Sequence, residues 1–229
     1  MKQTRRIPAL LLAVVMVFSL SLAGCKKEAP IPGDQVAVAL FEMILKDDAS
    51  KIVELFGYAD EAEARSDMGM NGSLYEELAV EMTSQFSAMG MTVSNEEMQE
   101  FVDAFISMFK NVTLTAKVKQ SDEKAGTAVV TCTINTFDAD AMTDAMTQVV
   151  TDIMSNEELL TGDEDALYSA MLRGMSEAIA GITPTENTAD FDVDFELADM
   201  DVNGTARKVW VPKDTEKFGE QLSTTAMGG

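Results

Sequence analysis

Two side chains common in nucleophilic and metal chemistry, cysteine and histidine, are scarce or absent in this sequence. The 229 residues include two cysteines, Cys25 and Cys132, and no histidine. A cysteine thiol can act as a nucleophile or carry a lipid, but without histidine the chain cannot use Ser-His-Asp or Cys-His catalysis or a histidine metal site. Cys132 alternates with Ala128, Val130 and Ile134 in a strand pattern, which predicts a buried structural thiol. Cys25 is the cysteine left for a chemical role.

The segment before Cys25 has the arrangement of a secretory signal. Lys2, Arg5 and Arg6 form a basic start, and residues 7–20 form an apolar core of signal-peptide length. A membrane-spanning helix needs about 20 apolar residues and stop-transfer charges behind them. We therefore expect a signal peptide and not a membrane-spanning anchor.

The residues Leu22-Ala23-Gly24-Cys25 resemble the lipobox of bacterial lipoproteins. The resemblance implies cleavage between Gly24 and Cys25, so that residues 1–24 are a lipoprotein signal peptide. It also implies that Cys25 becomes the new N-terminus and carries a diacylglyceryl group and palmitate. The expected location is the extracytoplasmic face of the cell membrane, with the membrane itself as a partner through the lipid on Cys25.

Composition limits the partners of the remaining chain. The leader contains three of the 17 basic residues and none of the 39 acidic ones, so the 205 residues after Gly24 carry a net charge of −25. Such a charge repels nucleic acid and anionic lipid headgroups. Plain solubility is the simplest interpretation, and a cationic partner or a divalent metal is the alternative. The 46% hydrophobic content predicts a folded chain of one domain.

The predicted domain follows a short tether. Residues 25–34, the lipidated cysteine and a segment with Pro30, Pro32 and Gly33, are expected to extend roughly 30 Å. We expect a single domain over residues 35–222, with a flexible tail at 223–229.

Apolar periodicity predicts helices in the first half of the domain. The first spans about residues 35–45, and the second begins at Asp48 or Ser50 and ends at Gly57. The Asp47-Asp48 corner is interpreted as a helix cap and not as a catalytic carboxylate pair. Two further helices begin at capping boxes, which are Ser73 to Glu76 and Ser94 to Glu97.

The second half predicts two β-hairpins separated by a helical insertion. Residues 112–119 and 127–137 alternate as strands, and residues 190–197 and 207–211 do so again. Between the hairpins, residues 138–181 read as helices. Their predicted starts are Asp138, Ser155 with Glu158, and Thr161 with Glu164, and a terminal helix is predicted from Asp214 to Leu222. The fold class is α+β, with amphipathic helices packed on one face of a curved antiparallel sheet of about four strands.

Two motifs could suggest metal binding. Asp199-Met-Asp201-Val-Asn203-Gly204 matches the first half of a calcium loop of the EF-hand type, but Trp210 stands at the twelfth position and strands flank the segment. An Asn-Gly hairpin turn explains the segment, although low-affinity surface calcium binding stays open. The 17 methionines favour adaptable core filling, with a plastic binding surface or copper ligation as alternatives. We predict no metal site, no cofactor and no catalytic residue.

The order of elements around "LFEMILKDDASKIVELFGY" and the two hairpins resembles uncharacterised bacterial lipoproteins that carry a domain of unknown function. The resemblance implies a nuclear-transport-factor-like or cystatin-like fold, in which helices pack on a curved antiparallel sheet and sometimes enclose an apolar pocket. Related folds include isomerases and dehydratases, but their catalytic positions have no match in this sequence.

These observations favour a lipid-anchored extracytoplasmic binding or interaction module that is not an enzyme. Its ligand could be a small molecule, a peptide or a protein, bound in an apolar cavity or on the Thr-rich and acidic face of the sheet. One alternative is a cavity enzyme of isomerase or lyase type using Asp, Glu or Tyr as acid and base. The other is a structural or stress lipoprotein of the cell envelope.

Overall fold

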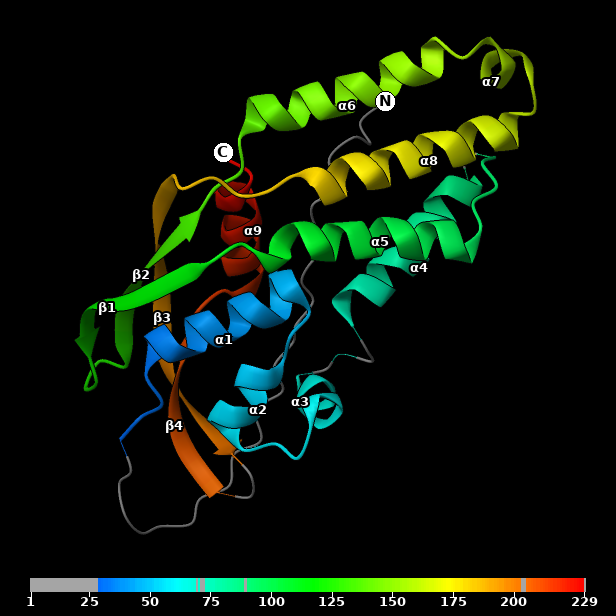
Figure 1. Cartoon of the computed structure of the whole chain (residues 1–229). Coiled ribbons are helices and arrows are strands. Elements are labelled where there is room, and N and C mark those ends of the chain that lie inside the picture. The colour runs from blue at the N-terminus through cyan, green and yellow to red at the C-terminus, as the bar shows by residue number, and fades with distance from the viewer. Residues whose placement is uncertain (1–28, 69, 71–72, 89, 203–204, 229) are drawn as a thin grey trace, which may run out of the picture.

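The chain folds as helices covering one face of an open, four-stranded antiparallel sheet (Figure 1). The structure is a computed structural model that describes residues 29–68, 70, 73–88, 90–202 and 205–228. Within these residues there are nine helices and four strands. The predicted α+β fold class is confirmed.

The sheet has the strand order β1-β2-β3-β4, with every neighbouring pair antiparallel. The strands are β1 (Leu114–Asp122), β2 (Thr127–Asn135), β3 (Thr188–Val202) and β4 (Thr205–Pro212). Both predicted hairpins are present, and β2 pairs with β3 to join them. On the covered face, Val130 lies opposite Val193 and Ala128 opposite Phe195, and all four are buried. The period-two pattern of these strands therefore marks the core side of the sheet.

Five helices precede the sheet, and the first of them lies directly on it. They are α1 (Gly33–Lys46), α2 (Ser50–Phe56), α3 (Glu61–Asp67), α4 (Leu74–Ala88) and α5 (Asn95–Lys110). Helix α1 contacts β1, β2 and β4, while α5 packs on α1 and α4. Phe41, Leu40 and Met43 of α1 are fully buried. The capping box at Ser94 is present at the start of α5, as predicted.

The chain joins the domain earlier than the predicted tether allowed. Ile31 is only 3% exposed. It forms a parallel bridge with Val209 of β4, with hydrogen bonds from Ile31 N–H to Lys208 O (2.9 Å) and from Trp210 N–H to Ile31 O (3.1 Å). A Cβ on Gly33 would lie 3.1 Å from the Phe195 ring, so glycine lets the start of α1 approach the sheet closely. Ile31 and Gly33, which the sequence analysis placed in the tether, are therefore packed against the sheet.

The predicted insertion forms three helices, α6 (Ala139–Met154), α7 (Glu157–Thr161) and α8 (Glu164–Gly181). We call residues 139–181 the helical arm. Helix α8 packs on α5 and α6 packs on α8, so the arm extends away from the sheet in successive layers (Figure 1). Close packing of α6 on α8 requires Gly174, since a Cβ there would lie 2.9 Å from Val149 Cγ1.

The predicted starts at Ser155 and Thr161 are wrong. Helix α7 is capped by Asn156 and α8 by Asp163, whose side chains accept hydrogen bonds from backbone N–H groups of the first turn. The Ser155 and Thr161 hydroxyls instead donate to carbonyls four residues back, at 2.7 Å in each case. Both residues therefore end helices, because their hydroxyls bond to the preceding turn.

The last helix, α9 (Thr215–Ala226), begins at the predicted cap Asp214 but extends past Leu222. Phe218, Leu222 and Ala226 are fully buried, and Phe137 N–H donates to Ala226 O at 2.8 Å. Residues 223–226 are therefore part of the domain and not the predicted tail. Helix α9 contacts β2 and β3 and shares the covered face of the sheet with α1.

Candidate functional site

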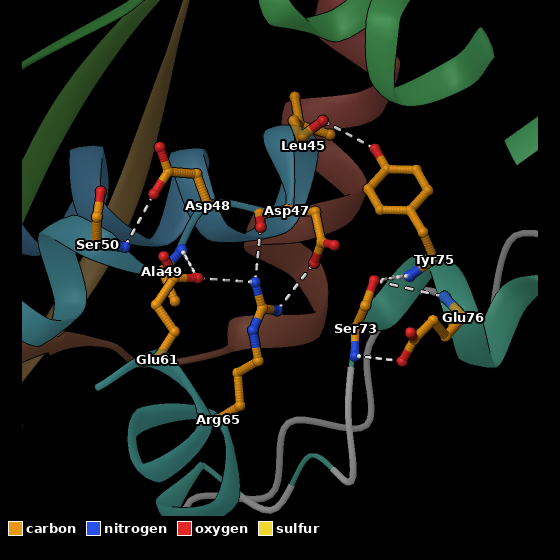
Figure 2. Close-up of polar contacts among 10 residues, drawn as sticks. All are labelled: Leu45, Asp47, Asp48, Ala49, Ser50, Glu61, Arg65, Ser73, Tyr75 and Glu76. Carbon is orange, nitrogen blue, oxygen red and sulfur yellow. Dashed lines mark hydrogen bonds and ion pairs between the residues drawn. The ribbon is translucent and has the colours of Figure 1, made fainter. Parts of the chain in front are cut away.

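A buried polar cluster joins the end of α1 to α3 (Figure 2). Arg65 of α3 is 8% exposed, and its Nη2 donates to the backbone oxygen of Asp47 at 2.6 Å. Its Nη1 forms an ion pair with Asp47 Oδ1 at 2.9 Å, and Nη2 lies 3.5 Å from Glu61 Oε2. Asp47 ends α1 in the left-handed region, with φ of 56°. Because Glu61 Oε2 also accepts from Ala49 N–H at 3.2 Å, α3 holds both sides of the corner between α1 and α2.

Tyr75 attaches α4 to the same corner. Its hydroxyl donates to Leu45 O at 2.8 Å (Figure 2). Burial raises the pKa of Tyr75 above its ordinary value, and the Asp47 carboxylate raises it further, so the hydroxyl stays protonated. Ser73 Oγ accepts from Glu76 N–H at 3.4 Å while Glu76 Oε2 accepts from Ser73 N–H at 3.3 Å, which confirms the predicted capping box.

The two carboxylates of the Asp47-Asp48 corner have different partners and different roles. Asp48 Oδ1 accepts from Ser50 N–H at 2.9 Å at the start of α2, in agreement with the predicted capping role. Hydrogen bonds from Ser50 lower the pKa of Asp48. Asp47 instead pairs with Arg65, a role that the sequence analysis missed. The signal for it is that Arg65 is the sole basic residue between Lys51 and Lys110.

The chemistry of this cluster is structural. Arg65, Asp47 and Tyr75 are paired with one another or with backbone carbonyls, which leaves no unpaired carboxylate among them to act as a base. A buried general acid would have a raised pKa. The pKa values of the Asp48, Glu97 and Asp192 carboxyls are lowered instead. The main cause is a hydrogen bond from Ser169 for Glu97 and one from Lys119 for Asp192. The cluster gives the enzyme hypothesis no support.

The uncovered face of the sheet carries a polar network. Lys119 of β1 reaches across β2 to Asp192 of β3, with 2.5 Å between Nζ and Oδ2. Thr131 and Thr133 of β2 donate to Asp192 and Asp190 at 2.6 and 2.7 Å. A shallow pocket of about 680 Å³ lies over β1 and β2 beside this network. Lys119 thus forms an ion pair with a carboxylate two strands away, and Lys208 pairs with Asp199 at 2.9 Å.

Exposed apolar side chains gather on the helical arm. A groove of about 590 Å³ runs along α6 and ends at Met227, just after α9. We call it the α6 groove, and its lining is largely apolar: Ala139, Met142, Thr143, Met146, Thr147, Val150 and Met227. Val150 is 52% exposed, and Met154, one turn further along α6, is 67% exposed.

The sequence analysis assigned the methionines to core filling. In α6, Met142 and Met146 are partly buried against the core and also line the α6 groove together with Val150, whereas Val149 is buried against α8. The side chains on the groove side of α6 can be recognised in the sequence by the four-residue spacing of Met142, Met146, Val150 and Met154.

Two other open grooves are more polar. One of about 620 Å³ lies between α6 and α8 and is lined in part by Gln148, Asp152, Arg173 and Glu177. The other, of about 470 Å³, lies beside α1 and α2 and includes Lys51. Neither combines a buried titratable pair with an enclosed cavity.

The predicted lipid attachment residue Cys25 and the cleavage residue Gly24 lie outside the described residues. Cys132 is fully buried, as predicted, and burial raises the pKa of its thiol to about 12. Within the described part of the chain, no cluster of three or more His, Cys, Asp or Glu side chains could hold a metal ion. No helix of that same part is long and apolar enough to cross a membrane. The strands predicted around the half calcium loop are present as β3 and β4, while Asn203 and Gly204 lie outside the described residues.

Comparison with known proteins yields one distant structural match. No family model matches the chain, and no curated protein matches it in sequence. A crystal structure of a Bacillus subtilis protein, described as a "putative lipoprotein (ycdA)", aligns with 15% sequence identity and a TM-score of 0.48. The alignment covers 80% of this chain and 55% of the Bacillus protein, so this chain spans about half of that protein's length. At this identity and TM-score, the match fixes neither a family nor a function.

Proposed function

We propose that this protein is a lipid-anchored extracytoplasmic interaction module, attached to the membrane through Cys25 and without enzymatic activity. One observation carries the interaction part. Of the six exposed large apolar side chains in the described residues, four lie on the helical arm: Val150, Met154, Leu160 and Met171. An accumulation of apolar side chains on one exposed element is typical of an interaction site. The signal arrangement before Cys25 supports the anchor.

The position of Ile31 shortens the proposed tether. Since Ile31 is bound to β4, only residues 26–30 separate Cys25 from the domain. Five residues in an extended conformation reach about 16 Å, at about 3.1 Å per residue. The edge of the sheet near Ile31 would thus lie close to the bilayer. Figure 1 shows the arm at the other end of the molecule from this entry point, so the arm would face away from the membrane.

We also propose the domain limits that follow from this packing. Residues 1–24 are the signal peptide, residues 25–30 the anchor and tether, and residues 31–227 one domain that includes the helical arm. Packing of α1 and α9 on an antiparallel sheet supports the cystatin-like or nuclear-transport-factor-like relation that the order of elements suggested.

The anchor is tested by mass spectrometry and fractionation of the full chain made in a bacterium that processes lipoproteins. We expect the mature protein to start at Cys25 with a diacylglyceryl mass on that residue and to remain with the membranes. Cys25→Ala should remove the lipid and release the chain, while Cys132→Ala should change neither. A membrane-bound chain without lipid on Cys25 would contradict the proposal.

The interaction part is tested by a photo-crosslinking residue placed at Val150, with a matched site at Val80 of α4, which is 72% exposed. We expect a defined protein to crosslink from position 150 and not from position 80. That protein, once purified, should bind the full chain, and Val150→Asn should weaken the binding. Equal crosslinking from both positions would argue against a site on the arm.

A further inference from the structure

We propose that the α6 groove binds a basic amphipathic helix of a partner protein. The inference rests on the proposed function and specifies the chemistry of the partner. It draws on the shape of the groove, the charge beside it and the poor match of the other candidate occupants.

The apolar row of α6 has the length of a short helix. Met142, Met146, Val150 and Met154 follow one another at four-residue spacing and therefore lie along one side of α6. From the first to the last they span about 18 Å, at about 1.5 Å per residue. Met227 stands at the end of the groove near the start of α6. Methionine side chains are flexible and polarizable, which lets such a row adapt to apolar side chains of a partner.

The charge beside the groove is acidic. Asp140 and Asp144 are exposed and lie one turn apart on α6, and each precedes by three residues a threonine, Thr143 or Thr147, on one edge of the groove. Helix α6 contains no lysine or arginine, and residues 138–181 contain ten acidic residues against one basic residue, Arg173. A bound segment that carries Lys or Arg beside its apolar side would lie next to these carboxylates.

The other occupants agree less well with the structure. A second copy of the chain would bring two acidic arms together, since residues 138–181 contain ten acidic residues against one basic residue, and like charges oppose that contact. A row of four side chains also falls well short of the roughly 800 Å² per partner that a stable dimer buries. An anionic lipid surface would be repelled, and the arm lies at the other end of the molecule from the start of α1 (Figure 1).

The test uses the full chain in phosphatidylcholine nanodiscs, with empty nanodiscs as the blank. The probe is a synthetic helix of about 14 residues, with leucines at three- and four-residue spacing and lysines beside them. One comparison peptide has the same composition in scrambled order, and another has glutamate in place of lysine. Binding is measured by fluorescence anisotropy, and its location by NMR of labelled methionine methyl groups.

We expect the lysine helix alone to bind, with shifts confined to Met142, Met146, Met154 and Met227. Val150→Asn should weaken binding about tenfold, because it replaces an exposed apolar contact with a polar one. The matched variant Val80→Asn should leave binding unchanged. Asp140→Asn with Asp144→Asn should weaken binding and reduce its dependence on salt.

Three results would overturn the inference: equal binding of the scrambled or glutamate peptide, binding that Val150→Asn leaves intact, or α6 shifts caused by self-association or by the lipid. Lipid on Cys25 is measured separately by mass. A lipidated chain that binds its crosslinked partner but not the lysine helix would refute the partner class and leave the proposed function standing. A chain without lipid on Cys25 would refute the anchor alone.

Discussion

Removing the Arg65 guanidinium should destabilise the fold markedly, although it lies in a short surface helix. Arg65→Met retains most of the apolar volume but removes the donor to Asp47 O and the ion pair with Asp47 Oδ1. Breaking a fully buried pair by removing one partner costs about 3–5 kcal/mol. The Asp47 side chain is 20% exposed and Glu61 46%, so solvent screens part of the loss. We therefore expect a loss of about 2–3 kcal/mol in the free energy of unfolding.

The assay is chemical and thermal unfolding of the full chain, followed by circular dichroism. A loss of this size should lower Tm by about 4–12 °C in a domain of this length. Lys51→Met is the matched control, because Lys51 forms an equally short but more exposed ion pair with Glu42, 2.9 Å long, and should cost under about 1 kcal/mol.

A double-mutant cycle with Asp47→Asn isolates the pair, since asparagine tolerates the left-handed backbone at that position. We expect a coupling free energy of about 1–2 kcal/mol between the two positions. A loss below about 0.5 kcal/mol for Arg65→Met, or additive effects in the cycle, would refute the account of the corner between α1 and α2.

Three further predictions concern the arm, the core and the sheet face. Gly174→Ala should lower Tm, because the new methyl would lie 2.9 Å from Val149 Cγ1 and overpacking costs about 1–3 kcal/mol. The thiol of Cys132, with its pKa raised to about 12, should resist iodoacetamide at pH 8 until the chain is unfolded, as read by peptide mass. An unfolded thiol ionises near pH 8.5 to 9, so this raised pKa contributes stability that is present below pH 9 and lost as pH rises toward 12. Carboxyl NMR should show Asp192 titrating below its ordinary pKa of 3.8, and Lys119→Met should raise that pKa.

Each of these three predictions has a control variant on the same helix or strand, or at the same residue. Gly181→Ala should be neutral or stabilising, because no atom lies within 4 Å of the new methyl. Cys132→Ala should remove the part of the stability loss above pH 9 that comes from ionisation of the Cys132 thiol. Lys117→Met should move the Asp192 titration much less than Lys119→Met does. If Gly174→Ala and Gly181→Ala have equal effects, close packing of α6 on α8 is not what requires glycine.

Elements with strong local signals could be predicted from the sequence. The alternation of β2 and β3 identifies the buried face, since Val130 and Val193 can reach the core only on that side of the sheet. The boxes at Ser73 and Ser94 mark the starts of α4 and α5, because both partners of a capping box lie within four residues of each other. In such cases the hydrogen bonds that define the element are local.

Features that depend on distant contacts could not be predicted. Pro30, Pro32 and Gly33 favour an extended tether by composition, but Ile31 is bound by β4, about 180 residues later. Ala226 is helical because its side chain and carbonyl meet the core near Phe137. The pairing of Arg65 with Asp47 likewise depends on how α3 folds back on α1. For the candidate site, the Met142 row is visible in the sequence, but its exposure follows from where α8 packs.

The parallel bridge at Ile31 also determines how the domain responds to pulling. A pull on the chain before residue 31 is resisted first by two backbone hydrogen bonds to β4, from Ile31 N–H to Lys208 O and from Trp210 N–H to Ile31 O. Because this segment runs parallel to β4, a pull toward the N-terminus acts along the strand and loads both bonds together in shear. Gly33 and α1 are shielded from the load until both bonds break. We therefore expect a pull on the N-terminus to break this bridge first, before any helix is disturbed.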